Sequence, residues 1–117
     1  MTNDDFMKWM CRNFGSDRRK LGTRRKIGNQ LKCAAAIGVC RETVCNASKK
    51  DPVPADLVKK IIRYELGKIG VTLPDEKRGA DRARDPFNRF MADIIKRDNF
   101  DLDKAVKLCK QYLKVTA

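Results

Sequence analysis

The side chains with the richest hydrogen-bonding chemistry lie close together between residues 41 and 50. Arg41 can donate two parallel hydrogen bonds to a guanine edge, and Asn46 can form a similar pair with adenine. Glu42 can accept a hydrogen bond from cytosine, and Thr43 can contact a phosphate or a thymine methyl group. Guanidinium, carboxamide and carboxylate groups therefore offer both donors and acceptors of hydrogen bonds within this short stretch.

A second set of side chains is suited to phosphate groups. Asn29 and Gln30 open an expected helix, and the N–H groups at a helix start can bind a phosphate. We expect basic side chains to add phosphate contacts at Lys32, Lys49, Lys50, Arg18, Arg19, Arg24, Arg25 and Lys26. The paired arginines also suit a flexible arm that enters a minor groove.

The distribution of charge supports a polyanionic partner. The 117 residues include 27 Lys or Arg and 15 Asp or Glu, which gives a formal net charge of +12. Residues 16–50 carry ten basic residues against two acidic ones, so most of the excess lies there. Clustered basic groups bind phosphates by displacing counterions. The alternative interpretation is a solvated basic face that has no partner.

Several other chemistries are disfavoured. Histidine is absent, which removes most zinc sites and the catalytic systems that depend on a histidine base. The five cysteines form no Cys-x-x-Cys pair, so we expect no metal site. The carboxylates are scattered among basic residues and no nucleotide motif appears, so we expect no cofactor and no enzyme activity. We expect reduced thiols, with Cys33 in the core, while oxidation sensing at Cys40 and Cys45 is the alternative. No export signal or membrane span is evident, so we expect a cytoplasmic, nucleoid-associated protein.

Helices must position these residues, because the apolar residues recur with helical period and no stretch alternates with a period of two. Thr2 is a good N-cap for a helix that runs to about Phe14, and Asp85-Pro86 is a good start for another. We expect further helices over 30–37, 41–48 and 55–66, and two that form a hairpin within 85–113. The fold class is therefore all-α.

Residues 30–48 predict two short helices that cross steeply at a tight turn. Ala34 is small enough for the helices to meet, and Gly38 can supply a positive φ in the turn. Val44 lies where an aliphatic residue of the second helix would fill the space between them. Ile37 and Ala47 complete this small core. The separations of four residues from Ala34 to Gly38 and of six residues from Gly38 to Val44 match a helix-turn-helix unit.

Residues 29–66 resemble the helix-turn-helix of the phage lambda repressor and Cro-like family. The matching positions are Gln30, Ala34, Gly38, Val39, Thr43 and Val44. The connector Asp51-Pro-Val-Pro54 and the helix after it are similar to the family's lead into a fourth helix. The sequence departs from the family at Cys40, where a Ser or Thr usually caps the recognition helix.

The resemblance implies a lambda-repressor-like domain that binds double-stranded DNA sequence-specifically. Residues 41–48 would then lie in the major groove and present Arg41, Glu42, Cys45, Asn46 and Lys49, with Thr43 at the edge. The implied role is transcription regulation by a small repressor of phage or mobile-element type. The alternatives are an origin- or partition-site DNA-binding protein and a basic helical protein–protein adaptor or inhibitor.

The expected organisation is a DNA-binding domain over 1–67, a linker over 68–84 and a helical hairpin over 85–117. Two helices alone would leave part of Phe87, Phe90 and Ile94 wet, and such patches usually mark an interface. We therefore expect a homodimer through residues 85–113. The alternative is that the hairpin packs on its own chain.

Overall fold

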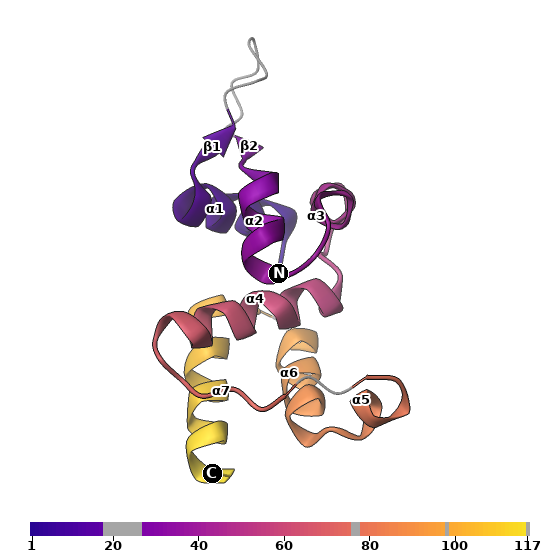
Figure 1. Ribbon diagram of the computed structural model, residues 1–117, viewed down its shortest axis with the longest axis vertical. Coiled ribbons are helices and arrows are strands. Elements are labelled where there is room, and N and C mark those ends of the chain that lie inside the picture. The colour runs from indigo at the N-terminus through magenta and orange to yellow at the C-terminus, as the bar shows by residue number, and fades with distance from the viewer. Residues whose placement is uncertain (18–26, 76–77, 98, 117) are drawn as a thin grey trace. The chain divides into compact units, whose positions relative to one another are not determined.

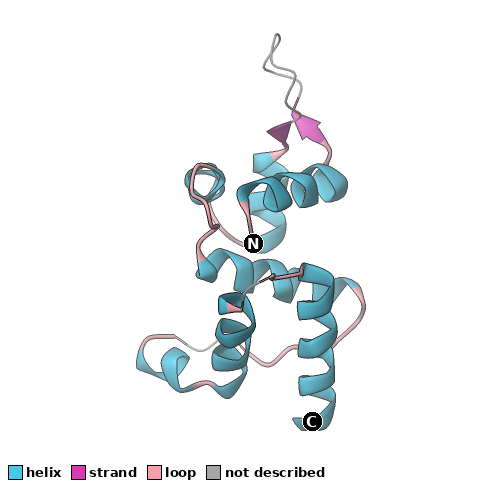
Figure 2. Ribbon diagram, turned by 180° about the vertical axis from the view of Figure 1, so that it is seen from behind, coloured by secondary structure: helices cyan, strands magenta, loops and turns pink. Residues whose placement is uncertain are grey.

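Apart from two short strands, the regular secondary structure of the described residues is helical, as expected (Figure 1). The computed structural model describes residues 1–17, 27–75, 78–97 and 99–116. Its helices are α1 (Asn3–Phe14), α2 (Gln30–Ile37), α3 (Arg41–Ser48), α4 (Ala55–Lys68), α5 (Ala80–Arg84), α6 (Pro86–Lys96) and α7 (Leu102–Thr116). Two strands of two residues each, β1 (Ser16–Asp17) and β2 (Ile27–Gly28), form an antiparallel ladder (Figure 2). Two residues are too few to show alternation in a sequence, so this ladder was not predicted.

The chain divides into two compact units, Met1–Pro54 and Ala55–Ala117. This division differs from the expected one, which placed α4 in the first domain and treated 68–84 as a linker. α4 contacts both α6 and α7, so the hairpin packs against a third helix of its own chain. The physical reason is the width of the apolar stripe on α4, where Leu57, Val58, Ile61, Ile62 and Leu66 are all buried.

The first unit is organised around α1, which contacts β2, α2 and α3. Thr2 caps this helix as expected, because its Oγ1 accepts a hydrogen bond from the Asp5 amide at 3.2 Å. The buried residues of α1 are Phe6, Trp9 and Met10. Burial of such large apolar side chains favours the packing of α1 on α2 and α3.

The turn between α2 and α3 has the conformation that the sequence predicted. Gly38 lies in the left-handed region, with φ 75° and ψ 35°. The Ala34 carbonyl accepts hydrogen bonds from the amides of both Gly38 and Val39, the latter at 3.0 Å. Ala34 and Val44 are buried. A reversal this tight brings the two helices into contact directly after the turn.

The second unit buries most of the apolar face of the hairpin. Phe87 is 3% exposed and Ile94 is 5% exposed, so the wet surface expected at these two positions does not exist. Phe90 is half-buried, and its ring stacks on Tyr112 with centroids 4.5 Å apart. Arg63 of α4 lies over the Phe87 ring, 5.5 Å from its centroid. Asp85 caps α6 as predicted, because its carboxylate accepts a hydrogen bond from the Phe87 amide.

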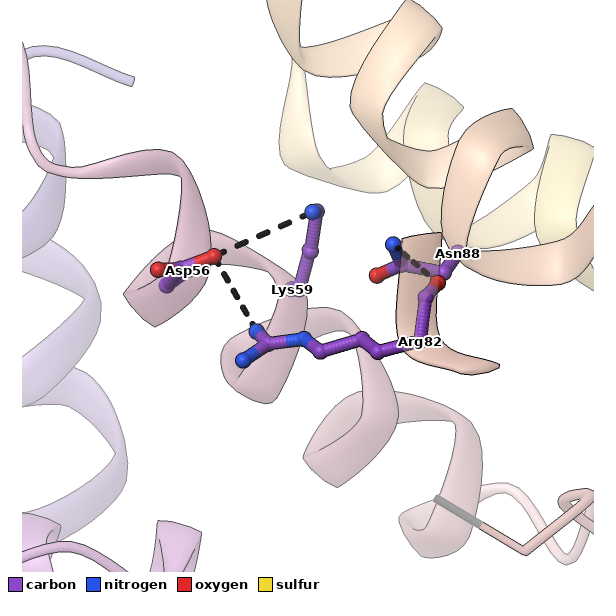
Figure 3. A network of polar contacts seen from close by, with 4 residues as sticks. All are labelled: Asp56, Lys59, Arg82 and Asn88. Carbon is purple, nitrogen blue, oxygen red and sulfur yellow. Dashed lines mark hydrogen bonds and ion pairs between the residues drawn. The ribbon is translucent and has the colours of Figure 1, made fainter. Parts of the chain in front are cut away.

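Much of the expected linker is ordered against the second unit. α5 is joined to α4 by Arg82, whose guanidinium lies 3.0 Å from the Asp56 carboxylate (Figure 3). Lys59 shares that carboxylate at 3.8 Å, and Asn88 of α6 donates a hydrogen bond to the Arg82 carbonyl. Asp56 is 73% exposed, so each ion pair contributes only about 0.2–1 kcal/mol. The network therefore orients α5 more than it stabilises the fold.

We expect Gly38→Val to lower the stability of the first unit by about 1–3 kcal/mol. A Cβ at Gly38 would meet no atom within 4 Å, so the loss comes from the positive φ and not from a clash. The loss of stability is measured by urea unfolding with tryptophan fluorescence as the signal. Trp9 reports on this unit, because it is the single tryptophan and is buried there. Gly38→Asn is the control, since asparagine tolerates the left-handed region. Equal losses for both variants would contradict the explanation.

Candidate nucleic-acid interface

α3 carries the predicted base-recognition residues on the face opposite its buried side. Val44 and Ala47 are buried, at 0% and 3% exposure. The side chains predicted to point outward are exposed at Arg41, Glu42, Thr43, Asn46 and Lys49, whereas Cys45 is half-buried. The structure therefore brings together one guanidinium, one carboxylate and one carboxamide on one short exposed helix.

The start of α3 is built on Cys40, which holds the N-cap position without a capping hydrogen bond from its side chain. Its Sγ instead lies 3.0 Å from Thr43 Oγ1, and its carbonyl accepts a hydrogen bond from the Thr43 amide. The Thr43 hydroxyl hydrogen bond is the largest influence on the Cys40 thiol and lowers its pKa, while Glu42 opposes this effect. The exposed thiol of Cys40 is therefore more readily ionised than an ordinary cysteine.

The end of α3 is held by Asn3, a residue to which the sequence analysis gave no role. Its side-chain amide donates hydrogen bonds to the carbonyls of Ser48 and Lys50. These carbonyls belong to the last turn of α3 and to the residues after it, which lack helical partners. Asn3 and Ser48 are 45 residues apart, so no local sequence pattern could have indicated this contact.

The start of α2 presents the residues expected to contact phosphate, but Asn29 has a different immediate role. Its side-chain oxygen accepts a hydrogen bond from the Lys32 amide at 3.1 Å, which makes it the N-cap. Asn29 and Gln30 are half-buried, and the Lys32 side chain is exposed. The oxygen of Asn29 thus serves the helix, and a phosphate at this end would be met by Lys32 and the helix start.

The basic side chains around α3 are only partly described. Lys32, Lys49 and Lys50 are exposed, and none of them has an ion-pair partner among the residues that the structure describes. The remaining expected phosphate contacts lie outside the described residues: Arg18, Arg19, Arg24, Arg25 and Lys26. The described part of the candidate interface therefore comprises residues of α3 and of the start of α2.

Two other cysteines, Cys33 and Cys109, are buried core residues. Cys33 is buried as predicted, and burial raises its pKa to about 11. Cys109 is buried in the second unit, and its pKa is likewise raised to about 11. Across 1–17, 27–75, 78–97 and 99–116, no group of metal-binding side chains forms a site. Within the same ranges, no helix has the length and apolar character needed to cross a bilayer.

Comparison of the chain with family models, with curated proteins and with solved structures gives no match.

We expect Cys40 to be alkylated by iodoacetamide before Cys33 and Cys109, because only its pKa is lowered and its thiol is exposed. Thr43→Val should slow the reaction of Cys40 below pH 8 and move its pH–rate profile to higher pH, since the hydrogen bond to the thiolate is lost. Thr43→Ser is the matched control, because it keeps the hydroxyl. Mass spectrometry of timed samples measures the rates, and an unchanged profile in Thr43→Val would refute the role of the hydroxyl.

Proposed function

We propose that the protein binds double-stranded DNA sequence-specifically and that α3 is its recognition helix. The proposal depends on the observation that α3 is amphipathic. Val44 and Ala47 are buried, whereas Arg41, Glu42 and Asn46 are exposed on the same eight-residue helix. An α-helix is about 10–12 Å in diameter with its side chains, so α3 fits the major groove of B-DNA, which is about 12 Å wide.

The exposed residues supply both donors and acceptors for base edges. Arg41 donates to guanine N7 and O6, and Asn46 pairs with adenine. Glu42 stands in the first turn of α3, where an acid also favours the helix. On a duplex its carboxylate would accept a hydrogen bond from the cytosine amino group.

The surrounding lysines suit the phosphate backbone. Lys32, Lys49 and Lys50 are exposed side chains of the first unit. Phosphate contacts fix the register of a protein on the duplex but carry no sequence information. The first unit thus combines groups for both parts of DNA recognition.

The biological role that fits best is that of a small transcriptional repressor of phage or mobile-element type, with a lambda-repressor-like helix-turn-helix formed by α2 and α3. The support is the left-handed turn at Gly38 together with the burial of Ala34 and Val44. Such a protein would be cytoplasmic and associated with the nucleoid. Binding to a replication origin or partition site would use the same surface.

The main argument for a homodimer through residues 85–113 was exposed apolar surface, and Phe87 and Ile94 are instead buried within the chain. The homodimer stays a prediction that a mass measurement tests. Light scattering at micromolar concentration distinguishes a dimer from a 13.4 kDa monomer. A dimer would select an inverted repeat, and a monomer would select a single short site.

We expect Arg41→Ala to weaken binding to the selected duplex by about 1–3 kcal/mol and to relax the preference at one base position. Selection from random duplexes followed by fluorescence anisotropy measures both effects. Arg12→Ala is the control, because it removes the same charge from an exposed position on α1. Unchanged affinity and an unchanged selected sequence in Arg41→Ala would exclude α3 as the recognition helix.

The same measurements separate DNA binding from the adaptor alternative. A protein–protein adaptor would select no duplex sequence at any salt concentration. A bound duplex should also protect Cys40 from alkylation, since this exposed thiol stands at the start of α3.

A further inference from the structure

The second unit carries a surface that the proposed function does not use. Four lysines lie along α7 with spacings of three, three and four residues: Lys104, Lys107, Lys110 and Lys114. At 3.6 residues per turn they fall within about a third of the helix circumference and span about 15 Å. All four are exposed, and the opposite side of α7 buries Ala105 and Cys109. We call these four residues the lysine stripe.

The acids of this region are confined to the helix start. Asp101 accepts a hydrogen bond from the Asp103 amide, and both residues lie where acids favour helix formation. No acidic residue follows Asp103 in the chain. Lys114 in the last turn is favoured by the helix dipole, but the dipole explains none of the other three lysines.

The lysine stripe is unfavourable for the isolated helix, because like charges three and four residues apart repel. In α4, by contrast, Lys59 pairs with Asp56 and Lys68 with Glu65, each at 3.8 Å. None of the four stripe lysines has an ion-pair partner within the described ranges 1–17, 27–75, 78–97 and 99–116. A linear polyanion that lies along such a row relieves this repulsion and releases its own counterions.

We propose that the lysine stripe binds the phosphate backbone of duplex DNA without sequence preference. This inference rests on the proposed function, to which it adds a second, sequence-independent contact surface. Lysine is a flexible point charge, which suits phosphates and reads no bases. A membrane is a poorer partner, because a helix binds a bilayer by burying its apolar face, and that face of α7 is packed within the unit.

The test replaces all four lysines of the stripe by glutamine in the full chain. Anisotropy is measured with the selected duplex and with a random duplex between 50 and 300 mM KCl. We expect the variant to lose affinity for both duplexes by the same factor. The slope of log K against log salt should fall by about two to four, because each lost phosphate contact contributes about 0.9.

A matched control removes the same charge elsewhere in the second unit. The variant carries glutamine at four other exposed bases: Arg78, Arg84, Lys96 and Arg97. For this control variant, the slope of log K against log salt should fall by less than one. An equal fall in both variants would show a net-charge effect and overturn the inference.

The remaining outcomes are also distinguishable. If the parent binds the selected duplex and the stripe variant keeps its salt slope, the inference fails while the proposed function stands. If the parent binds neither duplex, both fail. Loss of binding to phosphatidylserine vesicles with unchanged duplex binding would assign the stripe to a membrane surface instead.

Stability without DNA provides a further check that does not depend on binding. Replacing the four lysines removes charges that repel one another, so the second unit should unfold at a higher urea concentration. Circular dichroism measures the midpoint of this unfolding. A lowered midpoint would show that the lysines have a structural role, which would overturn the inference.

Discussion

The close crossing of α2 and α3 is the constraint on which the first unit depends. It requires a small residue at Ala34, a left-handed residue at Gly38 and an aliphatic residue at Val44, and each position meets its requirement. Once the helices cross in this way, the exposed side of α3 is determined by its buried side. The chemistry of the candidate interface is therefore a consequence of packing, because Arg41 and Asn46 are exposed by the burial of Val44 and Ala47.

The second unit follows a different rule, in which one helix with a wide apolar stripe covers a hairpin. α4 alone is too apolar to be solvated, and α6 and α7 together leave apolar area uncovered. When α4 packs on α6 and α7, the apolar surfaces of all three helices are covered, and Phe87 and Ile94 become buried. The unit then presents a mainly polar exterior, on which the charge pattern of α7 differs from that of α4.

Features governed by neighbouring residues could be predicted from the sequence, and features governed by distant contacts could not. The caps at Thr2 and Asp85 and the turn at Gly38 depend on residues within a few positions, and all three are present. The membership of α4 in the second unit and the reach of Asn3 to α3 depend on packing across many residues. On the candidate interface, the exposure of α3 was predictable from helical period. The N-cap position of Cys40 followed from the resemblance, but the contact between its thiol and Thr43 was not predictable, because it depends on a rotamer choice.

The attachment of Asn3 to the end of α3 has a consequence for molecular recognition. A helix of eight residues is marginal by itself in water, and without support it would have to become ordered when it meets a ligand. Ordering a backbone costs about 1–2 kcal/mol per residue, and this amount would be subtracted from the affinity. Because α1 holds the last carbonyls of α3, this entropy is lost during folding, before any partner arrives. The short helix therefore behaves as a preorganised element, and its association with a partner retains more of the interaction energy.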